Sequence, residues 1–573
     1  MVTESGKRTK ANQPFKSELE AEIHDELTHS LTKNKDSSLK TACPECNGTR
    51  LREDSRYILI KNQPIYAINR LSVSDAASLL STWKFTGREK ILARDILPEI
   101  IQRLHFLDQV GLGYLHLDRS ADTLSGGESQ RIRLAAQLGS NLRGVLYVLD
   151  EPTIGLHPRD NVKLLDTLAA LRDRGNSLLV VEHDEETIAR ASHLIELGPG
   201  AGSAGGLLTF NDIPKPSHYT SAVLKEDYPR RALPKTSAKT GWMKLTGCHA
   251  NNLKNIDVRI PQARLTVLTG VSGCGKSSLM RGCIAIAADK KLRSKNLPYK
   301  SSSGFNKIKH TFEVDQTPIG KTSRSCPATY VKILDPIRQL FAQLPDARTR
   351  GFTASRFSFN NAEGQCPECK GNGRIKLEMD FLPTTWVPCE ACHQMRYNPA
   401  TLEIRYNGKN IGEILKMSIR EAVDFFAAHT KIHRTLKLLN DTGLGYLQLG
   451  QPSPTLSGGE AQRIKLVSEL TKGRKSVTKA ALQNNNLYLI EEPSIGLHEE
   501  DVAKLIEVLH RLVNEGHTVI VIEHHTAIMA EADYIIDIGP EAGEKGGKIV
   551  TQGTPEHVAK SKTSRTAPFL KLG

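Results

Sequence analysis

The sequence predicts an α/β fold built from two copies of one module, the first incomplete, together with a small cysteine-rich module. The duplication is visible in TLSGGESQRI at residues 123–132, which recurs as TLSGGEAQRI at residues 455–464. Short apolar runs alternating with helical stretches predict parallel strands with helices between them. Two Cys-x-x-Cys pairs close together in the second copy predict the cysteine-rich module.

The repeat covers most of the chain. Residues 106–134 match residues 438–466 at an offset of 332, and VVEHD at Val180 matches VIEHH at Val521 at an offset of 341. Further upstream, the segment that begins CPECNG at Cys43 matches the one that begins CEACHQ at Cys389 at an offset of 346. A repeat of this length indicates one structural unit used twice.

Each copy reads as a series of α/β elements. A helix is expected after each SGGE turn, followed by a buried strand, VLYVLD or LYLIEE, then a helical stretch and a second buried strand, SLLVVEHD or TVIVIEHH. We expect a polar extension over 1–42, disordered or with one helix near 18–31, and a partial first module over 43–212. A linker rich in Pro, Lys and Ser is expected over 213–241, and the second module over 242–573.

A phosphate-binding loop is predicted at residues 270–278. GVSGCGKSS fits G-x-x-x-x-G-K-[ST] and follows the apolar run RLTVLTG, as a strand should precede such a loop. Glycines allow backbone N–H groups to turn toward phosphates, the lysine neutralises phosphate charge, and the serine hydroxyl can bind Mg²⁺. The residues predicted to bind ATP here are Gly270, Ser272, Gly273, Gly275, Lys276, Ser277 and Ser278.

The first copy has no counterpart of this loop. At the repeat offset, the equivalent lysine would precede Met1, and SGKRT at residues 5–9 lacks the leading glycine and any preceding strand. The sequence therefore combines one P-loop with two SGGE motifs.

A catalytic group is predicted where the strands of the second module end. Glu491 and Glu492 follow the strand LYLI, and His524 follows VIVIE. The first carboxylate can hold Mg²⁺ through water, the second can orient or deprotonate the attacking water, and the histidine can contact the γ-phosphate. A solvated strand end and a structural histidine are the alternatives, but the joint occurrence of these residues in both copies favours catalysis.

These motifs resemble known families. LSGGE, an apolar strand ending in DEP or EEP, and EH after a P-loop resemble the ATP-binding cassette superfamily. The duplicated motifs with paired Cys-x-x-Cys modules resemble the UvrA family, the damage-recognition subunit of bacterial excinuclease. LKNIDVRIP from Leu253, VDQTPIGKTSRSCPATY from Val314 and RGFTASRFSFN from Arg350 also resemble its second half.

The resemblance implies that the P-loop of one module is closed by the SGGE turn of the other. The site built by Lys276, Ser277, Glu491, Glu492 and His524 would be completed by Ser125, Gly126, Gly127 and the Q-loop residue Gln316. The turn at residues 457–459, with Asp150, Glu151 and His183, would face the missing first P-loop and form an incomplete site.

Glu491 departs from the family pattern, which has Asp there, as Asp150 in the first copy does. One methylene moves a carboxylate by roughly 1 Å, enough to disturb metal geometry or water placement. We therefore expect the site to bind ATP but to hydrolyse it slowly.

A structural zinc site is predicted at Cys366, Cys369, Cys389 and Cys392, with spacing Cys-x2-Cys-x19-Cys-x2-Cys. Four thiolates at this spacing can surround one Zn²⁺. A redox pair and free core cysteines are the competing interpretations. Cys43 and Cys46 have no second pair, because residues 1–39 contain no cysteine.

The net charge of +14 and pI near 9.2 favour a polyanionic partner. In UvrA-like proteins the region around the zinc module lies along DNA, which implies backbone contacts and readout of shape and deformability. The candidate phosphate contacts are Arg348, Arg350, Arg356, Arg374 and Lys376.

The leading interpretation is a UvrA-type ATPase, not itself a nuclease, that binds damaged double-stranded DNA in nucleotide excision repair. ATP, Mg²⁺ and Zn²⁺ are the expected cofactors, and the resemblance implies a dimer. Ordinary UvrB docking is not expected because the docking domain is absent, and a separate polypeptide would have to supply the first P-loop.

Two alternatives remain open: a non-hydrolysing, ATP-gated DNA-binding scaffold, and an idle carboxyl-terminal half of a split UvrA-type gene. No apolar run approaches the roughly 18 residues of a membrane span, so a cytoplasmic location without membrane contact is expected.

Overall fold

The computed structural model describes residues 43–124, 126–138, 143–199, 202, 205–215, 241–289, 297–315, 317–320, 322–377, 385–473, 485–497 and 499–570. The predicted extension over 1–42, most of the linker, Ser125 and Gln316 lie outside the described residues. The chain divides into two compact units, one of residues up to Leu71 with His116–Asp118, and one of Ser72–Leu115 with Arg119 onward.

The smaller unit contains a β-hairpin and a short helix. Strands β1 and β2 pair antiparallel, and Lys61 and Asn62 between them have φ of 51° and 62°, as a two-residue hairpin turn requires. Its elements are η2 (Asp54–Tyr57), β1 (Leu59–Ile60), β2 (Gln63–Pro64) and α2 (Ile65–Asn69).

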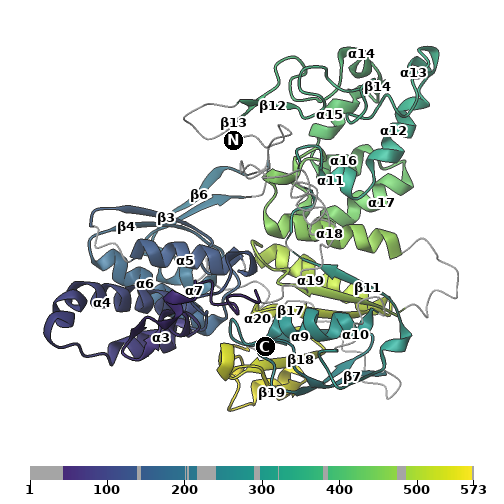
Figure 1. The fold of residues 1–573 in the computed structure, drawn as a ribbon. Helices are drawn as coiled ribbons and strands as arrows, with labels where there is room; N and C mark the ends of the chain where they lie inside the picture. The colour runs from purple at the N-terminus through teal and green to yellow at the C-terminus, as the bar shows by residue number, and fades with distance from the viewer. Residues whose placement is uncertain are drawn as a thin grey trace, which may run out of the picture. The chain divides into compact units, whose positions relative to one another are not determined.

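The second module contains a six-stranded sheet in the order β11-β16-β17-β9-β18-β19 (Figure 1). All neighbours are parallel except β19, which runs antiparallel at the edge. The strands are β9 (Leu265–Thr269), β11 (Ile308–Val314), β16 (Asn485–Glu491), β17 (Thr518–Ile522), β18 (Tyr534–Gly539) and β19 (Lys548–Gly553). All five residues of β9 and of β17 are buried, which confirms the predicted buried strands of this copy.

Both faces of this sheet are covered. On one face Tyr488, Val519 and Val521 pack in a cluster with α19 (Glu499–Asn514). On the other, Leu489 and Ile520 share a cluster with residues of β7 and β8 and with the helical segment after the P-loop.

Strands β10, β7 and β8 form a separate three-stranded sheet in that order. The remaining elements of this module are β7 (Trp242–Cys248), β8 (Ile256–Pro261), α9 (Lys276–Leu279), η7 (Met280–Ala285), α10 (Ile286–Ala288), β10 (Ser301–Ser303), η9 (Phe305–Lys307), α20 (Thr526–Ala530), η13 (Gly543–Lys545), α21 (Pro555–Ala559) and η14 (Ala567–Phe569).

The first module repeats only part of this sheet. In its described residues β3 (Leu146–Asp150) and β4 (Ser177–Val181) form one parallel pair, and β5 (Leu194–Gly198) and β6 (Leu207–Asp212) form a separate antiparallel pair. Helix α6 (Pro158–Asp173) contacts β4 and buries four leucines. The other helices here are α5 (Gly126–Leu138) and α7 (Glu185–Arg190).

The prediction of buried strands is wrong for the first copy. Alternate residues of β3 and β4 face solvent: Val148 is 63% exposed and Leu179 is 49% exposed. The physical reason is that the described residues of this module provide no counterpart of β9, β7 or β8 to cover that face.

Helices inserted between the P-loop and β16 form a separate core. Phe341, Phe357, Phe359 and Tyr397 lie at its centre, each at most 1% exposed. The helices are α11 (Pro327–Tyr330), α12 (Leu334–Ala342), α13 (Pro345–Thr349), α14 (Pro399–Leu402), α15 (Ile411–Lys416), α16 (Ile419–Phe425), α17 (Thr430–Leu439), η10 (Asn440–Leu444), η11 (Ser453–Thr455) and α18 (Gly458–Gly473). Their counterparts in the first module are α3 (Val73–Ser81), α4 (Gly87–Leu107), η3 (Asp108–Leu112) and η4 (Ala121–Thr123).

The cysteine-rich module consists of the antiparallel pair β12 (Arg374–Leu377) and β13 (Thr385–Pro388), which lies between the two Cys-x-x-Cys pairs. The hairpin β14 (Arg405–Tyr406) and β15 (Lys409–Asn410) follows it, 346 residues after β1 and β2, so the upstream repeat also holds in three dimensions. Among the helices that the structure describes, none has the length and apolarity that a bilayer crossing needs.

Candidate nucleotide site and zinc centre

The P-loop adopts the backbone that the motif predicts. It leaves β9 at Thr269 and enters α9 at Lys276, and Gly270, Gly273 and Gly275 have φ of 132°, 74° and 113°. The Lys276 side chain is buried inside the loop, where its ammonium donates to the carbonyls of Gly270 (2.8 Å) and Val271 (3.1 Å). A cation held here is placed to neutralise phosphate oxygens.

Tyr114 of the first module lies directly on this loop. A Cβ added to Gly273 would come within 2.4 Å of the Tyr114 ring, so glycine is required here because of the close approach as well as the positive φ. The Tyr114 hydroxyl donates to Glu128 Oε1 (2.6 Å), and Arg119 lies 3.4 Å from the same oxygen. Glu128 ends the first SGGE motif, so one tyrosine connects the P-loop of one module to the SGGE helix of the other.

The two predicted carboxylates have different surroundings. Glu491 Oε1 accepts from the Ser277 hydroxyl (2.6 Å), and its Oε2 lies 2.6 Å from the Arg281 guanidinium. Glu492 has φ of 47°, and its buried carboxyl has its pKa raised to about 7 because burial disfavours the charged form. Glu491 is thus beside the hydroxyl that can share Mg²⁺, and Glu492 can exchange a proton near neutral pH.

Gly155 brings the first module against Glu492. A Cβ added to Gly155, which has φ of 66°, would lie 2.9 Å from Glu492 Oε2. The Ser272 hydroxyl of the P-loop donates to the Gly155 carbonyl (3.3 Å). The turn after β3 therefore approaches both the carboxylate and the P-loop of the second module.

His524 and His157 meet at the same place, with ring centroids 5.6 Å apart. Burial lowers the pKa of His524 well below its usual value, and neither ring nitrogen has a hydrogen-bond partner among the described residues. His157 Nδ1 accepts from the Arg159 N–H, so Nε2 carries the proton and donates to Thr566 Oγ1 (3.1 Å). Burial lowers the pKa of His157 to about 3, so both imidazoles are neutral.

The structure therefore brings together Lys276, Ser277, Glu491, Glu492 and His524, as the sequence predicts. Gly127 lies at the start of α5, while Ser125 and Gln316 are not among the described residues and their roles stay predictions. Sequence reasoning missed Tyr114, Gly155 and His157. Their signal was present, because GLGYL and IGLH occur in both copies.

The repeat-equivalent residues form a matching set of contacts, with the roles of the two modules exchanged. The Tyr446 hydroxyl donates to Glu460 Oε1 (2.6 Å), as Tyr114 does to Glu128. A Cβ on Gly496 would lie 3.3 Å from Glu151 Oε1, and His183 Nε2 lies 3.7 Å from that oxygen. This second site thus has its SGGE helix, carboxylate and histidine, but the described residues supply no P-loop for it.

The four predicted zinc ligands converge. Their Sγ atoms all lie within 4.8 Å of one another, and the four cysteines are buried. Sγ of Cys366 lies 3.9 Å from that of Cys389, and Sγ of Cys369 lies 3.7 Å from that of Cys392. Four thiolates around Zn²⁺ at 2.3 Å are separated by about 3.8 Å, so the cluster fits a tetrahedral structural zinc site.

Cys43 and Cys46 are outside any such cluster in the described part of the chain, where the only four-residue thiolate group is the one above. Cys43 is exposed and Cys46 is partly exposed. No second pair that could close a tetrahedron with these two cysteines lies near them among the described residues.

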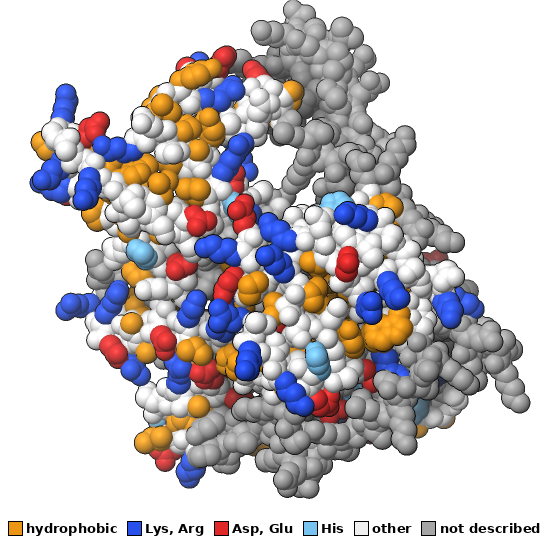
Figure 2. Space-filling model, turned by 90° about the horizontal axis from the view of Figure 1, so that it is seen from below, with side chains coloured by type: hydrophobic (Ala, Val, Ile, Leu, Met, Phe, Trp, Pro, Cys, Tyr) orange, Lys and Arg blue, Asp and Glu red, His pale blue; other side chains and the backbone are white. Residues whose placement is uncertain are grey.

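Two of the candidate DNA-contacting residues bind other side chains of the protein. Arg350 pairs with Glu403, and Arg356 donates to Thr401 Oγ1 (3.2 Å) with its guanidinium 4.6 Å from the Phe352 ring centroid. Arg374 and Lys376 lie on β12 within the cysteine-rich module, and Arg348 lies on α13. On the face in Figure 2, Lys and Arg side chains are spread widely among acidic ones.

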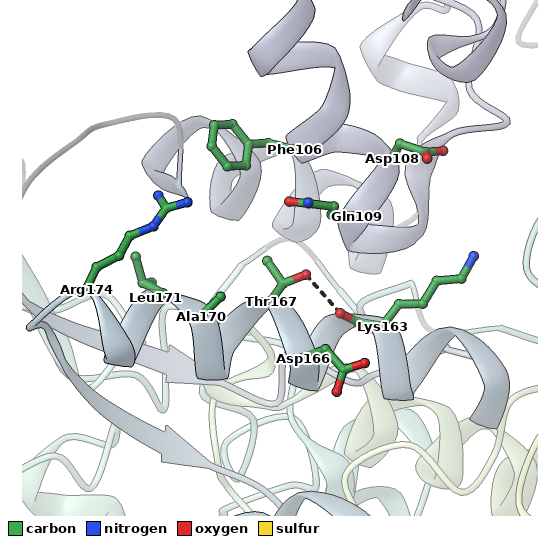
Figure 3. Close-up of a pocket in the computed structure, with 9 residues that line it drawn as sticks. All are labelled: Phe106, Asp108, Gln109, Lys163, Asp166, Thr167, Ala170, Leu171 and Arg174. Carbon is green, nitrogen blue, oxygen red and sulfur yellow. Dashed lines mark hydrogen bonds between the residues drawn. The ribbon is translucent and has the colours of Figure 1, made fainter. Parts of the chain in front are cut away.

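A pocket of about 370 Å³ lies between the end of α4 with η3 and the outer side of α6 (Figure 3). It is lined by Phe106, Asp108, Gln109, Lys163, Asp166, Thr167, Ala170, Leu171 and Arg174. It shares no residue with the P-loop, the carboxylates or the thiolates, so it does not belong to either site.

Curated proteins that resemble this chain include two UvrABC system A proteins. No protein-family model matches the sequence. UvrABC system protein A of Aquifex aeolicus is 50% identical over 556 residues, which is 94% of this chain. Nearly the whole chain is therefore similar to part of a UvrA protein. The UvrABC system protein A of Thermus thermophilus is likewise 50% identical, over 545 residues or 92% of this chain.

The solved structure of UvrA2 from Deinococcus radiodurans superposes on the chain with a TM-score of 0.83, at 43% identity and over 92% of this chain. The chain spans 58% of the Aquifex UvrA, 56% of the Thermus UvrA and 66% of the UvrA2 chain. The likeness therefore covers nearly all of this sequence but only part of each relative.

The zinc centre gives the first prediction. Cys369→Ser should release the bound zinc and loosen the β12–β13 module, because three thiolates no longer close the coordination shell. Zinc per chain, measured by atomic absorption, should fall from about one to near zero.

Cys43→Ser is the matched control, since it alters a Cys-x-x-Cys pair outside the cluster and should leave the zinc content unchanged. Equal zinc content in the wild type and the Cys369 variant would contradict the assignment.

Proposed function

We propose that this chain is a UvrA-type ATPase that binds damaged double-stranded DNA in nucleotide excision repair. ATP is hydrolysed at one composite site between the two modules. The proposal is supported by UvrA relatives at 50% identity and by a P-loop, Mg²⁺-binding groups and a general base that meet in one place.

The observation that carries the ATPase proposal is the approach of the first module to the second. Tyr114 lies on the P-loop glycine and Gly155 lies against Glu492. Such a site is assembled only when both modules are in place, so ATP binding is coupled to how the modules close on each other. The SGGE residues Ser125, Gly126 and Gly127 are proposed to complete this site, as the resemblance to UvrA implies.

Each residue has a distinct task in this proposal. Lys276 would neutralise the β and γ phosphate oxygens, and Ser277 with Glu491 would hold Mg²⁺, which would offset the charge on the phosphates. Glu492 accepts the proton of the attacking water, since its carboxyl is poised near neutral pH. Neutral His524 donates to a γ-phosphate oxygen, and Gln316 senses the nucleotide from the Q-loop.

DNA is proposed to run along the zinc module. The excess of basic residues favours phosphate contacts, which carry affinity but no sequence information. The proposed contacts are Arg348, Arg350, Arg356, Arg374 and Lys376, of which Arg374 and Lys376 lie on β12 within the cysteine-rich module. We also propose that the chain forms a dimer and is located in the cytoplasm. Its handover of DNA to UvrB is proposed to be limited.

A second candidate is an ATP-gated scaffold that binds DNA but barely hydrolyses ATP. The longer Glu491 side chain favours it, because this carboxylate is held by both Ser277 and Arg281. The two candidates share the site and differ in turnover.

Turnover of ATP by the purified chain separates them. With damaged duplex DNA present, the wild type should hydrolyse ATP at a rate that the DNA changes several-fold, and Lys276→Ala should reduce the rate at least 100-fold. Turnover equal to that of Lys276→Ala would reject the ATPase and favour the scaffold. DNA binding that does not weaken between 50 and 200 mM salt would reject the phosphate contacts.

The two tyrosines allow a matched test of the composite site. Tyr114→Ala should lower ATP turnover about tenfold, because it separates the SGGE helix from the P-loop. Tyr446→Ala removes the same side chain from the site that has no P-loop here, and it should leave turnover within twofold of the wild type. Equal effects of the two substitutions would contradict the assignment of the working site.

The raised pKa of Glu492 predicts that the rate of ATP turnover depends on pH. With its pKa near 7, this carboxyl is mostly protonated at pH 6 and mostly ionised at pH 8, so turnover should rise through about pH 7 and level off above it. ATP binding, measured in parallel, should not follow the same curve. A turnover that is constant from pH 6 to 8 would exclude Glu492 as the base.

A further inference from the structure

The carboxyl-terminal segment, which we define as residues 564–569, lies against the nucleotide site. Thr566 of this segment is buried, and its hydroxyl oxygen lies 3.1 Å from Nε2 of His157, a residue of the first module. The ring of Phe569 meets the same imidazole edge-on, with the two centroids 5.9 Å apart. A segment that follows β19 and α21 of the second module therefore contacts the start of α6 in the first.

A buried carboxyl group holds this segment in place. Asp537 on β18 is buried and accepts from the hydroxyls of Ser564 (2.5 Å) and Thr566 (3.3 Å). The Ser564 oxygen in turn accepts from the backbone N–H groups of Thr566 (3.1 Å) and Ala567 (2.9 Å). A buried network whose members satisfy one another is rigid, so the Thr566 hydroxyl has a fixed position.

The directions of these hydrogen bonds leave one arrangement for the His157 ring. Its Nδ1 accepts from the Arg159 N–H (3.2 Å), and its protonated Nε2 donates to Thr566. The Thr566 hydroxyl donates its own proton to Asp537. The imidazole is therefore held at both nitrogens, by the backbone of its own helix and by the hydroxyl that Asp537 orients.

An ionic connection runs beside the hydrogen-bonded one. Glu541, which follows β18, lies 2.9 Å from the Arg159 guanidinium and 3.0 Å from that of Arg565. The carboxyl-terminal segment and the start of α6 are thus joined at two points. Two residues before His157, Gly155 lies against Glu492, so this turn of the first module is bound along its length by the second.

His157 in turn packs on His524. The two rings meet at 85° with their centroids 5.6 Å apart. Neither nitrogen of His524 has a hydrogen-bond partner in the part of the chain that the structure describes, so packing holds this ring. Since buried polar groups are nearly always hydrogen-bonded, these nitrogens are available to a ligand, and the place of the His157 ring decides where they point.

We propose that the carboxyl-terminal segment is a positioning element of the nucleotide site. Asp537 orients the Thr566 hydroxyl, which fixes the plane of the His157 ring. That ring confines His524 at the place from which it reaches the γ-phosphate. Thr566 is thus a positioning residue, because it acts through two histidines. Its hold on His157 is independent of the reaction, whereas its effect on turnover rests on the proposed function.

Thr566→Val tests this role, because it removes the hydroxyl and keeps the shape of the side chain. It should lower kcat for ATP about tenfold, and the Kd of a non-hydrolysable ATP analogue should stay within about twofold, since the P-loop is unchanged. Thr566→Ser should restore kcat to within about twofold of the wild type. Thr563→Val is the matched control, because Thr563 is an exposed residue just before the segment and should not affect kcat.

His157→Ala separates positioning from a general loss of stability. It should lower kcat by the same factor as Thr566→Val, and the double variant should lose no more, because Thr566 acts through His157. The hydrogen bond itself is visible as an imidazole N–H signal in NMR spectra of the ¹⁵N-histidine-labelled chain, assigned by its loss in His157→Ala. This signal should vanish in Thr566→Val and persist in Thr566→Ser.

Three results would overturn the proposal. They are a kcat of Thr566→Val equal to that of Thr563→Val, a double variant in which the two losses multiply, and an imidazole signal that survives Thr566→Val. If the wild type shows no turnover that depends on Lys276, the proposed function fails, and the imidazole signal alone then decides whether Thr566 positions His157.

Discussion

The approach of Gly155 to the Glu492 carboxylate is the contact on which the rest of the site depends. The two residues come from different modules, and any side chain at position 155 would collide with the carboxylate. Beside this contact, the Ser272 hydroxyl of the P-loop donates to the Gly155 carbonyl. The pair of Gly496 and Glu151 forms the equivalent contact with the roles of the two modules exchanged.

Within that arrangement, electrostatics distinguish the complete site from the incomplete one. Lys276 lies among Glu492, His157 and His524, where its charge lowers the pKa of all three, although burial outweighs it at Glu492. At the other site burial raises the pKa of Glu151, the charges of Glu182 and Asp150 raise it further, and Arg463 opposes them. Among the described residues a P-loop lysine acts on Glu492, whereas the cation that lowers the pKa of Glu151 is Arg463, so the two carboxylates have different electrostatic surroundings.

Much of the fold and of the candidate site could be predicted from the sequence, because the repeat and the P-loop are local patterns. The strand before Gly270, the carboxylates at the end of β16 and the four converging cysteines follow from spacing and periodicity. The repeated GLGYL and IGLH motifs mark Tyr114 and His157, but their contacts could not be predicted from the sequence, since they join residues more than 150 positions apart. The prediction that β3 and β4 are buried failed for a similar reason: an apolar strand looks the same in sequence whether or not its covering layer is present.

The division of the first sheet into two ribbons also bears on how stability is distributed along the chain. Two-stranded sheets with one solvated apolar face are marginal, whereas a six-stranded sheet with both faces covered unfolds only with the whole domain. Among the described strands, β5 and β6 are therefore expected to open locally and to exchange their amide hydrogens before the strands of the larger sheet. The amides of β9 and β17, at the centre of the larger sheet, are the last to exchange.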